Sequence, residues 1–103
     1  MNTLKGYQKK YLKGLAHGMK PTVFVGQKGI LPSVVKAVDE SLDKHELIKI
    51  KFIEFKEKSQ KEEIIDVLER KTASDRVGMI GHIAILYRRQ KDSEKRKIEL
   101  PNR

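Results

Sequence analysis

Alternating apolar and charged residues along Leu47–Phe55 constrain the fold more than any other part of the chain. Side chains two residues apart lie on the same face of a β-strand, and successive ones lie on opposite faces. The charged positions between the apolar ones are Lys49 and Lys51. The alternating apolar residues are Ile48, Ile50 and Phe52. We therefore predict a half-buried strand with a basic outer face.

Helical spacing of apolar residues predicts three helices around this strand. The first spans Thr3–His17, and the second runs from Pro32, which suits a first helical turn, to about His45. The third follows a polar connection at Glu57–Lys61 and ends near Thr72. Short β-branched and aromatic runs predict further strands. These are Thr22–Val25, Arg76–Ile80 and His82–Arg89, with Gly81 at the bend between the last two.

The resulting order, α-β-α-β-α-β-β, predicts a compact α/β sandwich in which three helices cover a four-stranded mixed sheet. At 103 residues the chain has the size of one domain. We assign residues 1–97 to that domain and residues 98–103 to a C-terminal tail. The whole segment Gln90–Arg103 is basic, and we expect it to be mobile.

Charge is distributed unevenly along the chain. There are 23 basic and 14 acidic residues, which give a net charge of +9. The first acidic residue is Asp39, so residues 1–38 hold seven lysines and no carboxylate. Acidic residues are in excess over residues 39–75, and basic residues are in excess again after that. This pattern predicts one surface that attracts a polyanion and another that faces away from it.

Several classes of function are disfavoured by composition. Without cysteine there is neither a disulfide nor a thiolate metal site. The apolar runs are too short for a membrane span or a signal peptide, so we expect a cytoplasmic protein without a membrane partner. His17, His45 and His82 lie on separate predicted elements, which favours packing or capping over a metal or catalytic site. We expect no enzymatic activity, cofactor or small-molecule substrate.

The sharpest local feature is Gly26-Gln27-Lys28-Gly29, between a predicted strand and the helix that begins at Pro32. Unpaired amides and the dipole at a helix N-terminus attract anions. Glycines at both ends let the backbone approach a phosphate, and Lys28 adds a mobile charge. The alternative is a tight turn that needs a positive φ. Because the motif lies in the acid-free segment, we favour contact with the phosphates of a polymer.

Further basic residues could extend this surface. Lys5, Lys9 and Lys13 form one helical stripe, and Lys20 follows that helix. Lys49 and Lys51 lie on the alternating strand, and Arg88 and Arg89 lie at the end of the last predicted strand. The stripe, together with Lys20, could be only a solvated helix face, but we favour binding because it belongs to the same acid-free segment as the glycine motif. The strand lysines could equally pair with acidic neighbours. Tyr7 and Tyr11 could stack on bases, but their alignment with Leu4 and Leu15 favours core packing.

Matching motifs along nearly the whole chain resemble one protein family. They are Leu15-Ala16-His17, Lys20-Pro21, Val25-Gly26-Gln27-Lys28-Gly29, His45-Glu46-Leu47-Ile48-Lys49-Ile50-Lys51, Gly81, Leu86-Tyr87-Arg88 and Ile98-Glu99-Leu100-Pro101. In this order and spacing the chain resembles the YhbY-like proteins, which consist of one chloroplast RNA splicing and ribosome maturation (CRM) domain. One position departs from the family pattern. Leu31 stands where the family usually has Thr before the Pro, so the usual side-chain N-cap is missing.

The resemblance implies a fold similar to the C-terminal domain of translation initiation factor three, and RNA binding through the Gly-x-x-Gly loop. For bacterial members with one domain it implies association with precursor large ribosomal subunits. We therefore expect a monomeric ribosome assembly factor that contacts ribosomal RNA. The alternatives are a general RNA chaperone and a structural nucleic-acid-binding protein.

Overall fold

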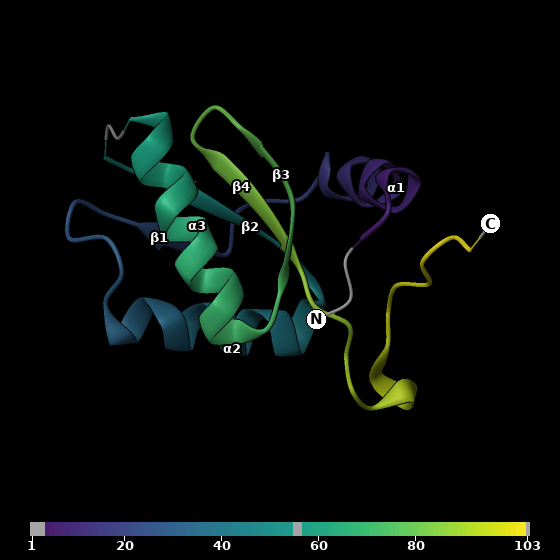
Figure 1. Cartoon of the computed structure of the whole chain (residues 1–103). Coiled ribbons are helices and arrows are strands. Elements are labelled where there is room, and N and C mark those ends of the chain that lie inside the picture. Colours follow the sequence, from purple (N-terminus) through teal and green to yellow (C-terminus); the bar gives the residue numbers. More distant parts are fainter. Residues whose placement is uncertain (1–3, 55–56, 103) are drawn as a thin grey trace.

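The computed structural model describes residues 4–54 and 57–102, so Thr3, Phe55 and Arg103 lie outside it. The first helix nevertheless begins later than predicted, at Gly6, and the strand predicted to reach Phe55 ends at Phe52. Within these ranges the chain forms three α-helices, four strands and one short 3-10 helix (Figure 1). Their bounds are α1 Gly6–Ala16, β1 Val23–Val25, α2 Pro32–His45, β2 Leu47–Phe52, α3 Lys58–Thr72, β3 Asp75–Ile80, β4 Ile83–Tyr87 and η1 Ser93–Lys95. The predicted fold class is confirmed.

The described strands form one mixed sheet in the order β1-β2-β4-β3. β1 and β2 are parallel and are connected through α2, because a parallel pair needs a crossover rather than a tight turn. β4 is antiparallel to both β2 and β3. Gly81, with a φ of +58°, begins the turn between β3 and β4, a conformation that glycine adopts without a steric cost.

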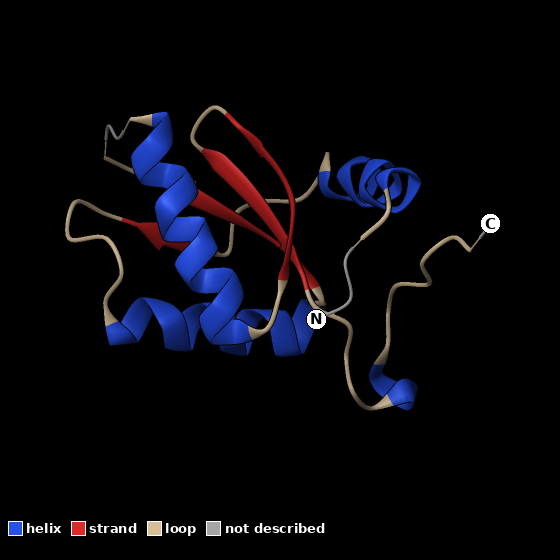
Figure 2. Cartoon of the chain, viewed as in Figure 1, coloured by secondary structure: helices blue, strands red, loops and turns tan. Residues whose placement is uncertain are grey.

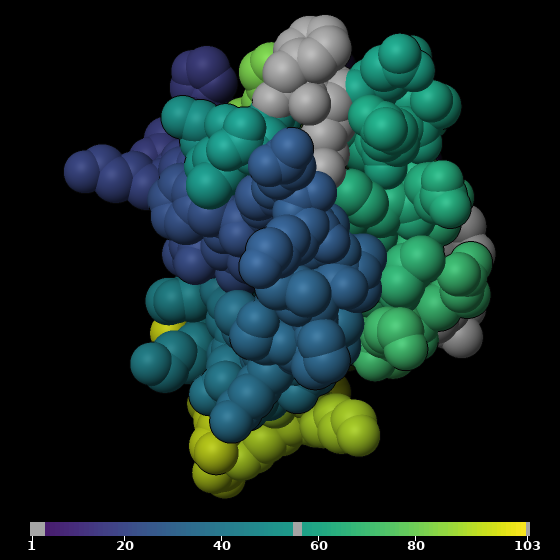
Figure 3. Space-filling view, turned by 90° about the vertical axis from the view of Figure 1, so that its left-hand side faces the viewer, coloured from purple at the N-terminus to yellow at the C-terminus, as the bar shows by residue number. Residues whose placement is uncertain are grey.

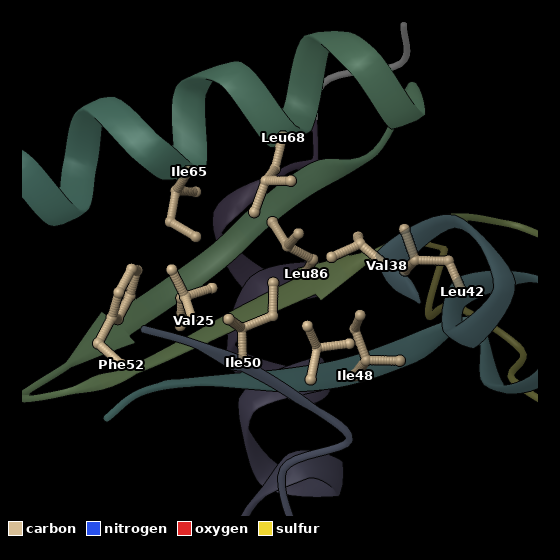
Figure 4. Close-up of a cluster of buried hydrophobic side chains, with 11 residues drawn as sticks. Val25, Val38, Leu42, Ile48, Ile50, Phe52, Ile65, Leu68 and Leu86 are labelled. Carbon is tan, nitrogen blue, oxygen red and sulfur yellow. The ribbon is translucent and has the colours of Figure 1, made fainter. Parts of the chain in front are cut away.

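The first hydrophobic core lies between the sheet and the helices α2 and α3 (Figures 2 and 4). Ile48, Ile50 and Phe52 of β2 point toward the helices, as their alternation predicts. They meet Val38 of α2 and Ile65 of α3, both fully buried. Helix α2 begins at Pro32 and ends at His45, as predicted, and its residues Val38 and Leu42 are buried in this core.

The second core lies on the opposite face, under α1. Leu12 and Ala16 are fully buried there, whereas Tyr11 and Leu15 are 42% and 41% exposed. The prediction that Tyr11 packs in the core with Leu15 is therefore wrong. The face of α1 that meets the sheet is the one bearing Ala16, which lets the backbone of the helix approach the strands closely.

The C-terminal segment packs along this second core, although we expected a mobile tail. Ile98 and Leu100 pack against it, and the Gln8 amide of α1 donates a hydrogen bond to the Pro101 carbonyl oxygen at 3.2 Å. Figure 1 shows the segment turning back from the end of β4 toward α1. These contacts are between residues far apart in sequence, so local composition alone does not reveal them.

Glu46 holds this segment in place. Its side chain is 1% exposed and accepts hydrogen bonds from the backbone amides of Gln90, Lys97 and Ile98 at 2.6 to 3.0 Å. Its own φ is +62°, at the C-terminal end of α2. A buried carboxylate is stable when backbone N–H groups surround it in this way. Glu46, at the junction of α2 and β2, thus links the body of the domain to the C-terminal segment through three hydrogen bonds.

Helix α3 begins earlier than predicted. The stretch Glu57–Lys61 was expected to be a polar connection, but α3 starts at Lys58. The Gln60 side chain accepts a hydrogen bond from the Glu57 amide at 2.9 Å, which satisfies a free N–H at the helix start. Lys61 is buried and its Nζ donates to the Gly81 carbonyl oxygen at 2.7 Å. Through Lys61, the first turn of helix α3 therefore contacts the loop between β3 and β4 and does not contribute an apolar side chain to the core.

Candidate nucleic-acid interface

The segment from Gly26 to Gly29 forms a tight turn between β1 and α2. The Gly29 amide donates to the Gly26 carbonyl oxygen at 3.1 Å, and Gly29 has a φ of +69°. Gln27 and Lys28, at the tip, are exposed. Figure 3 shows this loop and α2 across the middle of one side of the molecule. The loop thus lies between a strand and the second helix, as predicted, with its two glycines half-buried. The positive φ of Gly29 also agrees with the alternative that the motif is a tight turn.

Two residues join the turn to α2 and leave the helix start open. Ile30 packs against the first core and anchors the loop. Leu31 takes the N-cap position, where no side chain accepts a hydrogen bond from the helix. Its carbonyl oxygen accepts from the Val34 amide at 2.9 Å. The first turn of α2 carries no acidic residue that would offset the positive end of the helix dipole, and Leu31, Pro32 and Ser33 are exposed there.

The lysines of the predicted stripe lie on the other side of the sheet from α2. Lys5 is the N-cap residue of α1, and Lys9 and Lys13 lie within that helix. Lys5, Lys13 and Lys20 are exposed and Lys9 is half-buried. The stem of Lys13 crosses β3, because a Cβ on Gly78 would lie 2.7 Å from the Lys13 Cε. The lysine stripe of α1 and the glycine loop beside α2 are therefore on opposite sides of the sheet.

The two lysines of β2 have different environments. The Lys49 Nζ donates to the carbonyl oxygens of Met19 at 3.0 Å and His17 at 3.4 Å, close to the end of α1. It therefore satisfies backbone carbonyl groups, not the neighbouring acids that we considered. Lys51 is exposed and is the register partner of Phe24 in β1. Of the two, Lys51 is the one placed to meet a ligand.

Arg88 is held within the fold. Its guanidinium forms an ion pair with Asp39 at 2.5 Å and donates to the backbone carbonyl oxygens of Asp39 and Thr72 at 2.9 and 2.8 Å. These contacts join the end of β4 to both α2 and α3. Arg89, the next residue, is exposed. The geometry gives Arg88 a structural role that the sequence did not indicate.

Acidic residues gather on α3. Glu62 and Asp66 both pair with Arg76 of β3, at 3.5 and 2.6 Å. Glu69 also accepts a hydrogen bond from the Arg76 amide at 2.7 Å. Four acidic residues of the middle segment thus lie on α3, the helix that Figure 3 shows beside α2, whereas Asp39, Glu40 and Asp43 lie on α2 beyond its first turn. An anion that approaches the glycine loop would meet the start of α2, whose first turn holds no acidic residue.

Two side chains with a raised pKa, Asp75 and Tyr87, lie at the opposite end of the sheet from the glycine loop. Burial raises the pKa of Asp75, and the nearby Glu69 carboxylate raises it further. Burial also raises the pKa of Tyr87, with a second contribution from the charge of Glu46. Asp75 and Tyr87 are register partners in β3 and β4. Both shifts therefore arise at the end of the sheet away from the glycine loop.

The histidines and carboxylates do not converge. His17, His45 and His82 are exposed and lie on different elements, with His17 at the C-cap of α1. Among residues 4–54 and 57–102, no group of three His, Asp or Glu side chains could hold a metal ion. No helix within the same ranges has the length and apolar character to cross a membrane.

Sequence reasoning missed Glu46 and Phe24. Glu46 looks like one more acidic residue of the charged middle segment, and only the fold reveals its burial. Phe24 lies between the buried residues Val23 and Val25 and is itself 53% exposed. The alternation of a strand predicts this exposure, because the central residue of a three-residue strand faces away from its neighbours.

The chain belongs to the CRS1 / YhbY (CRM) domain family, whose model matches residues 4–88. It is 41% identical over its whole length to the full length of a Haemophilus influenzae protein named "RNA-binding protein". It is 34% identical to the Bacillus subtilis protein named "Probable RNA-binding protein YqeI", over 95% of this chain and 99% of that one. A solution structure from Staphylococcus aureus, of a hypothetical protein for which RNA binding is proposed, matches with a TM-score of 0.78 and 36% identity. That match covers 96% of this chain and 100% of the other.

Proposed function

We propose that this protein is an RNA-binding ribosome assembly factor that contacts ribosomal RNA of the precursor large subunit. The observation that carries the proposal is the exposed turn from Gly26 to Gly29, which presents Lys28 beside the uncapped start of α2. The names of the relatives support RNA as the partner. The protein acts in the cytoplasm as a monomer, without a cofactor or catalytic step.

The turn suits an RNA phosphate for three physical reasons. Pro32 has no N–H, and the amides of Val34 and Val35 donate to the Leu31 carbonyl oxygen, so the Ser33 amide is the donor that the first turn of α2 offers to a ligand. The helix dipole favours negative charge there. The glycines bring the backbone close to a ligand without a Cβ in the way. Lys28 adds a charge that follows the phosphate without fixing its position. Such contacts position a nucleic acid and read little of its sequence.

Co-sedimentation tests the ribosomal part of the proposal. Cell extracts are separated on a density gradient, and the protein is detected across the fractions. An assembly factor accompanies precursor large subunits and is absent from mature ribosomes. A structural ribosomal protein would remain with both. A general RNA chaperone would spread over RNA-containing fractions without preference, and either of these patterns would contradict the assembly role.

The salt dependence of binding tests the role of phosphate contacts. We expect log K for a single-stranded RNA to fall linearly with log salt concentration, with a slope of about 0.7 per phosphate contacted. Lys28→Ala should weaken binding modestly and reduce the slope by about one contact. Fluorescence anisotropy at several salt concentrations measures both quantities. Glu63→Ala, on the acidic surface of α3, is the matched control and should not lower the affinity. An affinity independent of salt would contradict the proposal.

A further inference from the structure

A row of side chains crosses the whole sheet on the face that α1 only partly covers. Register places Phe24 of β1 beside Lys51 of β2, Lys51 beside Ile83 of β4, and Ile83 beside Ile80 of β3. Phe24 is 53% exposed and Ile80 is 68% exposed. The neighbouring residues along these strands point into the first core, so the four side chains share the opposite face. An exposed aromatic ring and an exposed isoleucine thus flank a lysine on one open surface.

This row connects two other features of the molecule. At one end, Ile53 is 57% exposed, and its Cδ1 would lie 3.8 Å from a Cβ placed on Gly26. The apolar surface therefore reaches the glycine turn. At the other end is a small groove between the end of α1 and the sheet. Its lining residues are Lys13, His17, Lys49, Ile80, Ile83 and Ile85.

The charges on the strands and the helix that carry or border the row are mainly cationic, and the exposed carboxylate of Glu54 follows Ile53 at one end. The sequences of α1, β1, β2 and β4 contain no carboxylate. In β3 the one acidic residue is Asp75, which is paired with Tyr87 at the far end of the strand. Lys51 lies within the row, and Lys20 is exposed just before β1. An apolar strip bordered by cations fits a ligand with flat apolar groups on an anionic chain, which describes single-stranded nucleic acid.

We infer that unpaired bases of the bound RNA rest on this row, with one base stacked on the ring of Phe24 and the adjoining phosphates at Lys51 and the glycine turn. This inference rests on the proposed function and adds a second contact to it. A second copy of the chain fits less well, because a symmetric contact would bring Lys51 of one copy toward the same cationic surface of the other. The row would favour single-stranded over duplex RNA, since the bases of a duplex are stacked on one another.

Replacement of the ring tests this inference. We expect Phe24→Ala to bind a single-stranded RNA of about ten nucleotides roughly tenfold more weakly, because the base loses the ring on which it stacks. Binding to a hairpin whose stem holds the same sequence should not change. Phe24→Tyr keeps the ring and is the matched control, with an affinity close to that of the parent. Because Phe24 is half-exposed, neither change opens a cavity in the core.

A fluorescent variant gives a second readout. The chain contains no tryptophan, so Phe24→Trp carries the only indole. We expect the single-stranded RNA to quench the emission of Trp at saturation, because the base stacks on the indole, whereas the hairpin should leave it nearly unchanged. Equal quenching by both RNAs would place the ligand near the ring without stacking and would overturn the inference.

The outcomes separate this inference from the proposed function. If the parent protein binds neither RNA, the proposed function fails, and the inference fails with it. If the parent binds both but Phe24→Ala binds the single strand equally well, only the stacking contact is overturned. If analytical ultracentrifugation shows that the parent is a dimer and Phe24→Ala is a monomer with unchanged RNA affinity, the row holds a second copy instead.

Discussion

Glu46→Ala is expected to lower the free energy of unfolding by about 3 kcal/mol, because it leaves three backbone amides without their acceptor. The carboxylate is buried and accepts from Gln90, Lys97 and Ile98. Its loss should release the C-terminal segment from the second core and expose Ile98. Urea denaturation followed by circular dichroism measures the change, and hydrogen exchange at the Lys97 amide shows whether the segment has opened.

Glu46→Gln is the matched control. It keeps the side-chain length and the Cβ at the same positive φ, and it removes the charge and one of the two acceptor oxygens. We expect a loss of stability smaller than that of Glu46→Ala. If both variants were as stable as the parent, the C-terminal segment would be held by its apolar contacts, and the carboxylate would contribute nothing.

Gly29→Asp should weaken RNA binding by about tenfold relative to Gly29→Asn, which corresponds to about 1.4 kcal/mol. Asn and Asp have nearly the same shape, and both tolerate the positive φ of +69° better than other side chains do. The nearest atom to a Cβ at this position is the Ile64 Cδ1 at 4.0 Å, so either side chain has space. The pair therefore differs in charge alone, beside the start of α2.

Fluorescence anisotropy with one single-stranded RNA measures both affinities, after thermal melts have established that the two variants are folded. Gly29→Asn reports the cost of a side chain at the turn, and the further loss in Gly29→Asp reports repulsion of a phosphate. Equal affinities for the two variants would mean that no phosphate approaches Gly29. The lysines of α1 would then become the leading candidate surface.

Local patterns in the sequence predicted the buried faces of β2 and α2. The alternation in β2 and the stripe of α2 each contain enough apolar residues to determine which side is buried. Helix α1 was harder, because its apolar residues define two overlapping stripes. The stripe with Tyr11 and Leu15 contains the larger side chains, but close approach to the strands favours the one with Leu12 and Ala16. This choice depends on the partner surface, which a helical pattern does not contain.

The part of the candidate site that consists of adjacent residues could be predicted from the sequence. The roles of side chains that contact residues distant in sequence could not. The turn from Gly26 to Gly29 could be read from adjacent residues, and its geometry follows from them. The roles of Lys49 and Arg88 depend on carbonyl groups from other elements, which only the fold brings near. Glu46 lies 52 positions before Ile98, one of its three partners. A basic composition therefore predicts a binding surface, but it does not show which lysines and arginines already form hydrogen bonds or ion pairs within the fold.

NMR mapping of the RNA contact tests the central claim most directly. A single-stranded RNA is added to the isotopically labelled full chain, and backbone amide shifts are followed to saturation. We expect the largest changes at Gln27, Lys28 and Gly29 and at Ser33 in the first turn of α2, with little change at Glu62 and Asp66 on α3. Saturating RNA that shifted other amides and left those of the turn and Ser33 unmoved would contradict the account.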